Sequence, residues 1–159
     1  MKRLLQKELQ EEVRNLIVNT LFEEFVGMSE SAFSKELYMN TDQMKCMLQN
    51  GMHIGNHGYD HYWLNSLTEV KQRIEIEKGC EFLESIGVDM NNWTMCYPYG
   101  AYDQSLINIL KEKKCRLGLT TKVDVVDLSL HNKFELPRLD TNDIPKNSQA
   151  QTEVWYSKA

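Results

Sequence analysis

The amino-acid sequence predicts an α/β fold with a parallel sheet. From about residue 52 onward, short apolar segments of strand length alternate with segments whose apolar residues recur with helical period. Strands separated by a helix in this way pair in parallel, because the helix carries the chain back to the same end of the sheet. At 159 residues the chain has the size of one domain and can bury about two thirds of its unfolded surface.

The N-terminal part is predicted to be one long helix over residues 2–26. Apolar residues recur there at helical steps, and Gly27 is placed to end the helix. The apolar stripe consists of Leu5, Leu9, Val13, Leu16, Leu21 and Phe25. Such a stripe faces a core, an open sheet edge or a second copy of the chain.

Two shorter helices are expected next. Ser29 or Ser31 can cap a helix that runs to about Tyr38, and Thr41 can cap another that stops at Asn50. Serine and threonine suit this position because their side-chain oxygen accepts a hydrogen bond from the first turn of the helix.

The α/β part is expected to begin with a strand near 52–57. The segment 66–69, Ser-Leu-Thr-Glu, has the pattern of a capping box and predicts a helix through about Ile86, which Gly87 closes. A strand near 93–97 follows that helix.

The second half of the sheet follows the same alternation. Asp103 is placed to cap a helix that runs to about Lys114. Strands near 116–120 and 134–139 complete the parallel set. The stretch 142–159 is polar and is predicted to form an arm or tail, with Trp155 as its anchor.

Composition argues against several classes of protein. The net charge is −5, from 18 basic and 23 acidic residues. The sequence contains no cluster of basic residues of the kind that binds nucleic acid or a membrane surface. No apolar run approaches the ~20 residues of a membrane span, and the N-terminus turns polar too soon for a signal peptide. The cysteines lack any CxxC spacing, so we expect reduced, mostly buried thiols in a cytoplasmic protein. They are Cys46, Cys80, Cys96 and Cys115.

A histidine pair is the strongest candidate for chemistry. His57 and His61 are separated by three residues in a segment rich in glycine and aromatic residues. Two imidazoles at this spacing can bind one divalent metal if the backbone curls through about one helical turn. The predicted strand at 52–57 would place them at its carboxyl end, where α/β folds usually hold their active sites. Taken alone, two histidines at this spacing are more often structural residues than metal ligands. His53, earlier in the same strand, is expected to point into the fold or to bond a neighbour.

Two later segments strengthen the functional interpretation. Residues 95–103 read Met-Cys-Tyr-Pro-Tyr-Gly-Ala-Tyr-Asp, and residues 136–140 read Leu-Pro-Arg-Leu-Asp. Together with the His-Gly-Tyr-Asp-His segment at 57–61, and in this order, they resemble the polysaccharide deacetylase family, also called the NodB-homology or carbohydrate esterase 4 group. The resemblance covers roughly residues 36–145.

The resemblance implies an incomplete or distorted parallel (β/α) barrel with a long N-terminal helix. The expected single domain, 1–159, comprises a helical segment at 1–40, a deacetylase-like βα core at 41–141 and the arm at 142–159. In the family, a histidine pair with this spacing binds zinc or a similar cation. His57 and His61 are therefore the expected metal ligands, with zinc first, and with cobalt, nickel or no metal as alternatives.

The resemblance also assigns roles around the metal. A backbone N–H at Tyr99 would face the developing oxyanion, and Arg138 would pair with an active-site carboxylate, here Asp140 or Asp103. Tyr62 and Trp63 are expected in the core. The residues expected to contact the sugar are Tyr59, Pro98, Tyr99, Gly100 and Tyr102.

The sequence departs from the family pattern in three places. The family's Asp-Asp motif supplies the base and the third metal ligand, but residues 1–41 contain no Asp. Cys96 stands where the family often has Arg, and the later Leu-x-His motif is missing. The expected sources of the missing carboxylate are Asp60, Asp103, Asp140 or another chain.

The resulting prediction is a metal-dependent hydrolase that removes acetyl groups from N-acetylated sugars or polysaccharide. The alternative is an inactive or truncated deacetylase-like domain that serves as a carbohydrate-binding or assembly module. The sequence leaves open the sugar and whether an amide or an ester is cleaved. The expected partners are a carbohydrate and further copies of the chain. Copies are expected because the helix over residues 2–26 would cover the open barrel, either of its own chain or, by exchange of the helix, of a second copy.

Overall fold

The computed structural model describes residues 4–147, and the expected anchor Trp155 lies outside them. The chain divides into two compact units, Met1–Cys46 and Met47–Ala159. The division falls within one short helix. Among the described residues, no helix is both long and apolar enough to cross a bilayer.

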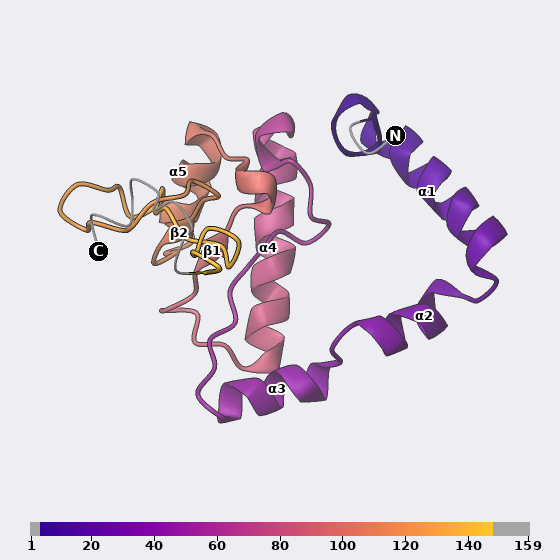
Figure 1. Cartoon of the computed structure of the whole chain (residues 1–159), viewed down its shortest axis with the longest axis horizontal. Helices are drawn as coiled ribbons and strands as arrows, with labels where there is room; N and C mark the ends of the chain where they lie inside the picture. The colour runs from indigo at the N-terminus through magenta and orange to yellow at the C-terminus, as the bar shows by residue number, and fades with distance from the viewer. Residues whose placement is uncertain (1–3, 148–159) are drawn as a thin grey trace. The chain divides into compact units, whose positions relative to one another are not determined.

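The first unit is helical (Figure 1). A π-helical turn, Leu4–Glu8, precedes α1 (Glu11–Val26), α2 (Glu30–Leu37) and α3 (Thr41–Gln49), whose last residues belong to the second unit. The prediction of one uninterrupted helix over 2–26 is wrong, because Gln10 adopts an extended conformation and α1 starts after it.

The helix ends in this unit follow local capping chemistry. Gly27 closes α1 in the left-handed conformation, and Ser29 caps α2 by accepting from the Ala32 N–H. Thr41 is not the cap of α3. Asn40 takes that role, because its side chain and that of Gln43 each accept the other residue's backbone N–H at 2.9 Å.

The second unit holds two helices and the parallel strands (Figure 1). α4 (Glu69–Ile86) packs against α5 (Gln104–Glu112). Thr68, not Ser66, caps α4, since residues 64–66 form a separate 3-10 turn. Gly87 ends α4 and Asp103 caps α5, as predicted.

The strands are shorter than predicted but lie in the predicted order. β1 (Met95–Cys96) pairs in parallel with β2 (Gly118–Leu119). A single parallel bridge extends this two-stranded sheet on each side. Asn56 bridges to Met95 of β1, and Leu136 bridges to Leu119 of β2. The described residues thus form a four-membered parallel array of two short strands and two single bridges, and they do not close a barrel.

The core of this unit lies between the parallel array and the two helices. Its largest fully buried side chains include Trp93, Tyr97, Phe134, Leu64, Ile76 and Leu106. The cysteines are less buried than predicted: all four are free thiols, but only Cys115 is fully buried. The array is therefore held by packing on α4 and α5, and its carboxyl ends are left to carry loops.

Candidate active site

Asn56 fixes the start of the histidine loop. Its backbone N–H donates to Thr94 O, just before β1, at 2.8 Å, and its carbonyl oxygen accepts from Cys96 N at 2.9 Å. Its side chain is 3% exposed, accepts the Gly58 N–H and donates to Ile76 O in α4. The chain can then turn sharply, because Gly58 has a φ of 76°, a conformation that side chains with a Cβ disfavour.

His57 points back toward β1. Its Nδ1 lies 2.7 Å from the carbonyl oxygen of Cys96. A carbonyl oxygen only accepts, so Nδ1 carries the proton and the lone pair of the neutral ring is on Nε2. A backbone carbonyl that orients an imidazole in this way is the usual outer-shell partner of a metal-binding histidine.

His61 brings a second imidazole to the same point. Its Nε2 lies 3.1 Å from Nε2 of His57, and the two rings meet edge to face at 4.7 Å between centroids. His61 itself has a φ of 57°, an uncommon left-handed conformation that aims its ring at His57. Burial, and secondly the charge of His57, lower the pKa of His61, which favours the neutral imidazole.

The loop between the two histidines rests on a buried carboxylate. Glu75 of α4 is 3% exposed, and its Oε2 accepts the backbone N–H of Tyr59 at 3.0 Å and of Asp60 at 2.8 Å. Desolvation raises the pKa of Glu75, and the bond from the Asp60 N–H partly opposes that rise. Sequence reasoning missed this residue, because nothing in a helical Glu signals which loop it will meet.

The Pro98–Gly100 turn forms the facing wall. Tyr99 has a φ of 57°, and its ring lies 4.8 Å from that of His61 and stacks on Trp63 at 4.6 Å. Trp63 therefore joins the site and is not the core residue that the sequence predicted. Within residues 4–147 the Tyr99 N–H has no hydrogen-bond acceptor.

The other predicted sugar-contacting residues divide into two groups. Tyr59 is 55% exposed, so its ring is open to a ligand on one side, while Lys78 Nζ lies 4.8 Å from its centroid. Tyr102 stacks on Tyr97 and donates its hydroxyl to Glu135, which makes it a packing residue. Pro98 is buried, and Gly100, with a φ of 70°, closes the turn.

Two other polar residues named from the sequence bond elsewhere. His53 Nε2 lies 2.9 Å from Thr94 Oγ1, on the strand side of the loop. Arg138 Nε donates to Thr120 O at 2.9 Å. Among the described residues Arg138 makes no close ion pair with Asp140 or Asp103, but its charge is one of the causes that lower the pKa of Asp140.

The three candidate carboxylates all have structural roles here. Asp103 caps α5 and accepts from Gln72, and Asp140 accepts the N–H and side-chain amide of Asn142. Asp60 lies in the histidine loop beside Glu75. In residues 4–147 no group of three His, Cys, Asp or Glu side chains could hold a metal. The structure therefore brings together the two histidines and no third ligand.

The histidine pair fits a shared cation. Two nitrogens bound to one tetrahedral zinc ion, each at about 2.0–2.1 Å, lie roughly 3.3 Å apart. The observed 3.1 Å between the two Nε2 atoms is close to that value. The fixed tautomer of His57 and the lowered pKa of His61 favour the same use.

Comparison with known proteins identifies the family. The profile of the polysaccharide deacetylase family matches residues 17–118, more than half of the chain, so the chain belongs to this family. The Bacillus subtilis (strain 168) protein YxkH, whose name assigns it to the polysaccharide deacetylases, is 27% identical over 85 residues. That match covers 54% of this chain and 30% of YxkH.

A solved structure shares the fold. The Streptococcus pyogenes deacetylase PplD, in complex with acetate, matches with a TM-score of 0.58 and 24% sequence identity. The match covers 64% of this chain and 44% of PplD. The chain thus spans less than half the length of each of these relatives.

Proposed function

We propose that this chain takes part in the metal-dependent hydrolysis of acetyl groups on N-acetylated sugars or polysaccharide. The observation that carries the proposal is the convergence of the two Nε2 atoms, 3.1 Å apart, beside a turn with an unbonded N–H. Family membership supports the reaction class. The exposed ring of Tyr59 and the ring of Tyr99 support a sugar ligand, because sugar rings stack on aromatic faces.

The roles follow from the geometry. His57 and His61 would hold a divalent cation, with zinc as the first choice. Such a cation polarises an acyl oxygen and lowers the pKa of its bound water toward neutrality. The Tyr99 N–H would donate to the oxyanion as the acyl carbon becomes tetrahedral, a contribution of about 3 kcal/mol. For the base and the third ligand, the candidates are still Asp60, Asp103, Asp140 or another chain.

A second function is favoured by one observation. Because no third protein ligand joins the histidines in the described part of the chain, the same loops could bind carbohydrate or mediate assembly without catalysis. We place either function in the cytoplasm, which the four free cysteines support.

The test is acetate release by the purified chain with and without added zinc. N-acetylglucosamine oligomers and an O-acetylated glycan serve as parallel substrates, which separates amide from ester cleavage. Zinc-dependent release that disappears in the double variant His57→Ala, His61→Ala is the expected result. Binding of the oligomers with no release above that double variant would instead establish the non-catalytic module.

We also propose that the chain associates with a second copy through α1. Leu16 and Phe25 of α1 are 69% and 74% exposed, and both belong to the predicted apolar stripe. Exposed apolar surface of this kind favours association. Replacing Leu16 and Phe25 with Ser should lower the particle mass measured by light scattering, while the matched change Glu12→Ser, Glu23→Ser should not. A wild-type chain with the mass of a monomer would contradict this proposal.

A further inference from the structure

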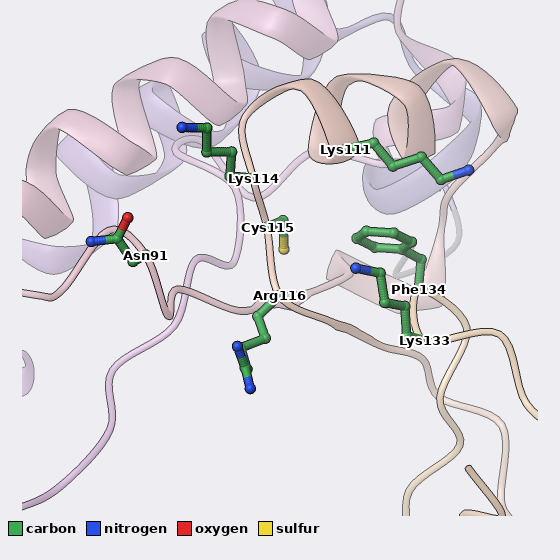
Figure 2. A pocket seen from close by; sticks show the side chains of 7 residues that line it. All are labelled: Asn91, Lys111, Lys114, Cys115, Arg116, Lys133 and Phe134. Carbon is green, nitrogen blue, oxygen red and sulfur yellow. The ribbon is translucent and has the colours of Figure 1, made fainter. Parts of the chain in front are cut away.

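We infer that the second unit carries an anion-binding pocket for a small phosphate-bearing molecule, at the end of the sheet opposite the histidine pair. The pocket has a volume of about 320 Å³ and is shown in Figure 2. Volumes of roughly 300 Å³ and above are typical of small-molecule sites. Four of its lining residues are cationic, namely Lys111, Lys114, Arg116 and Lys133.

The position of the pocket separates it from the candidate active site. Arg116 precedes β2, and Lys133 precedes the bridge residue Leu136, so both lie at the amino ends of the parallel array. His57 and Tyr99 follow the array at its carboxyl ends. A ligand in this pocket would therefore not contact the histidine loop.

The charge in the pocket is not neutralised by the protein. Within residues 4–147, none of the four cations forms an ion pair with a carboxylate, although the neighbouring Lys113 pairs with Glu77. Asn91 is the neutral polar residue of the lining. The nearby carboxylate of Asp89 accepts three hydrogen bonds, two from Asn91 and one from Asn92. Four cationic side chains that line one small volume raise the local positive potential, which favours an anion.

Two of the lining lysines lie over the ring of Phe134, which is itself buried. Lys133 Nζ lies 4.8 Å and Lys111 Nζ 5.9 Å from the centroid of the Phe134 ring, as Figure 2 shows from close by. Burial raises the pKa of Cys115 to about 12, so its thiol stays neutral and does not repel an anion. The carbonyls of Ile109, Leu110 and Lys111 at the end of α5 already accept bonds from residues 113–115.

These features favour a compact phosphate group over other anions. A single carboxylate carries one charge and would leave most of the four cations unmatched, whereas a pyrophosphate or phosphate ester presents several charged oxygens. A long polyanion is disfavoured, since the chain as a whole carries a net charge of −5.

The test is calorimetric titration of the 159-residue chain with pyrophosphate, in EDTA so that no metal at the histidines contributes. We expect one site, weakened at least tenfold in the double variant Lys111→Gln, Lys133→Gln. The control variant Lys35→Gln, Lys45→Gln loses the same charge outside the pocket and should stay within twofold of the wild type. Raising the salt from about 50 to about 300 mM should also weaken binding, because it shortens the screening length.

Three results would overturn the proposal: no binding of pyrophosphate, equal losses in the two double variants, or tighter binding of citrate than of pyrophosphate. Amide NMR shifts of the wild-type chain keep the test independent of variant folding. Pyrophosphate should shift residues 111–116 and 133–134, and shifts confined to residues 57–63 and 97–101 would also contradict the pocket.

Discussion

The variant His57→Ala should bind zinc at least a hundredfold more weakly than the wild type and should release no acetate above background. His57 contributes one of the two converging Nε2 atoms, and it is the one whose tautomer is fixed by Cys96 O. Removing it leaves His61 alone, and a single imidazole holds a divalent cation poorly. Zinc affinity measured by competition with a chromogenic chelator gives the magnitude.

The matched control for this experiment is His53→Ala. It removes the same side chain four residues earlier, where the imidazole bonds Thr94 on the strand side of the loop. Its zinc affinity should stay within about threefold of the wild type. Equal losses in the two variants would show that zinc binds nonspecifically to histidines, and the proposed site would then be wrong.

The variant Glu75→Ala should destabilise the chain by about 1–3 kcal/mol and weaken zinc binding at least tenfold. Its carboxylate accepts two backbone N–H groups of the histidine loop, and deletion leaves those donors without their partner. The loop would then lose the support that holds His61 in its left-handed conformation. Urea denaturation and the chelator assay measure the two effects.

Two further variants separate positioning from simple loss of stability. Glu75→Gln keeps an oxygen acceptor of the same length, so it should recover part of the zinc affinity. Glu81→Ala, on an exposed site of the same helix, should change neither quantity. A Glu75→Ala protein with wild-type zinc affinity would show that the carboxylate has no role in placing the histidines.

The order of the elements could be predicted from the sequence because it depends on local signals. Asp103, Gly27 and Gly87 end or begin helices through bonds and dihedral angles that lie within a few residues. The cap of α3 is Asn40, one residue before the predicted Thr41, and the cap of α4 is Thr68, two residues after the predicted Ser66. In each case the neighbouring side chain accepts a backbone N–H from the first turn of the helix.

The candidate site was only partly predictable for a different reason. His57 and His61 could be found from their spacing, but Glu75 and Trp63 enter through contacts that no local pattern encodes. Arg138 is a mixed case. Its charge acts on Asp140, one of the two carboxylates expected from the sequence, but its Nε–H donates to the carbonyl of Thr120.

The central claim is that Nε2 of His57 and Nε2 of His61 share one cation. Imidazole nitrogen NMR during a zinc titration tests it most directly, because it reports each ring nitrogen separately. The expected result is that both Nε2 resonances shift together and saturate at one zinc per chain, while Nδ1 of His57 keeps its proton toward Cys96 O. Zinc that shifts only one of the two rings, or that binds His57 through Nδ1, would contradict the claim.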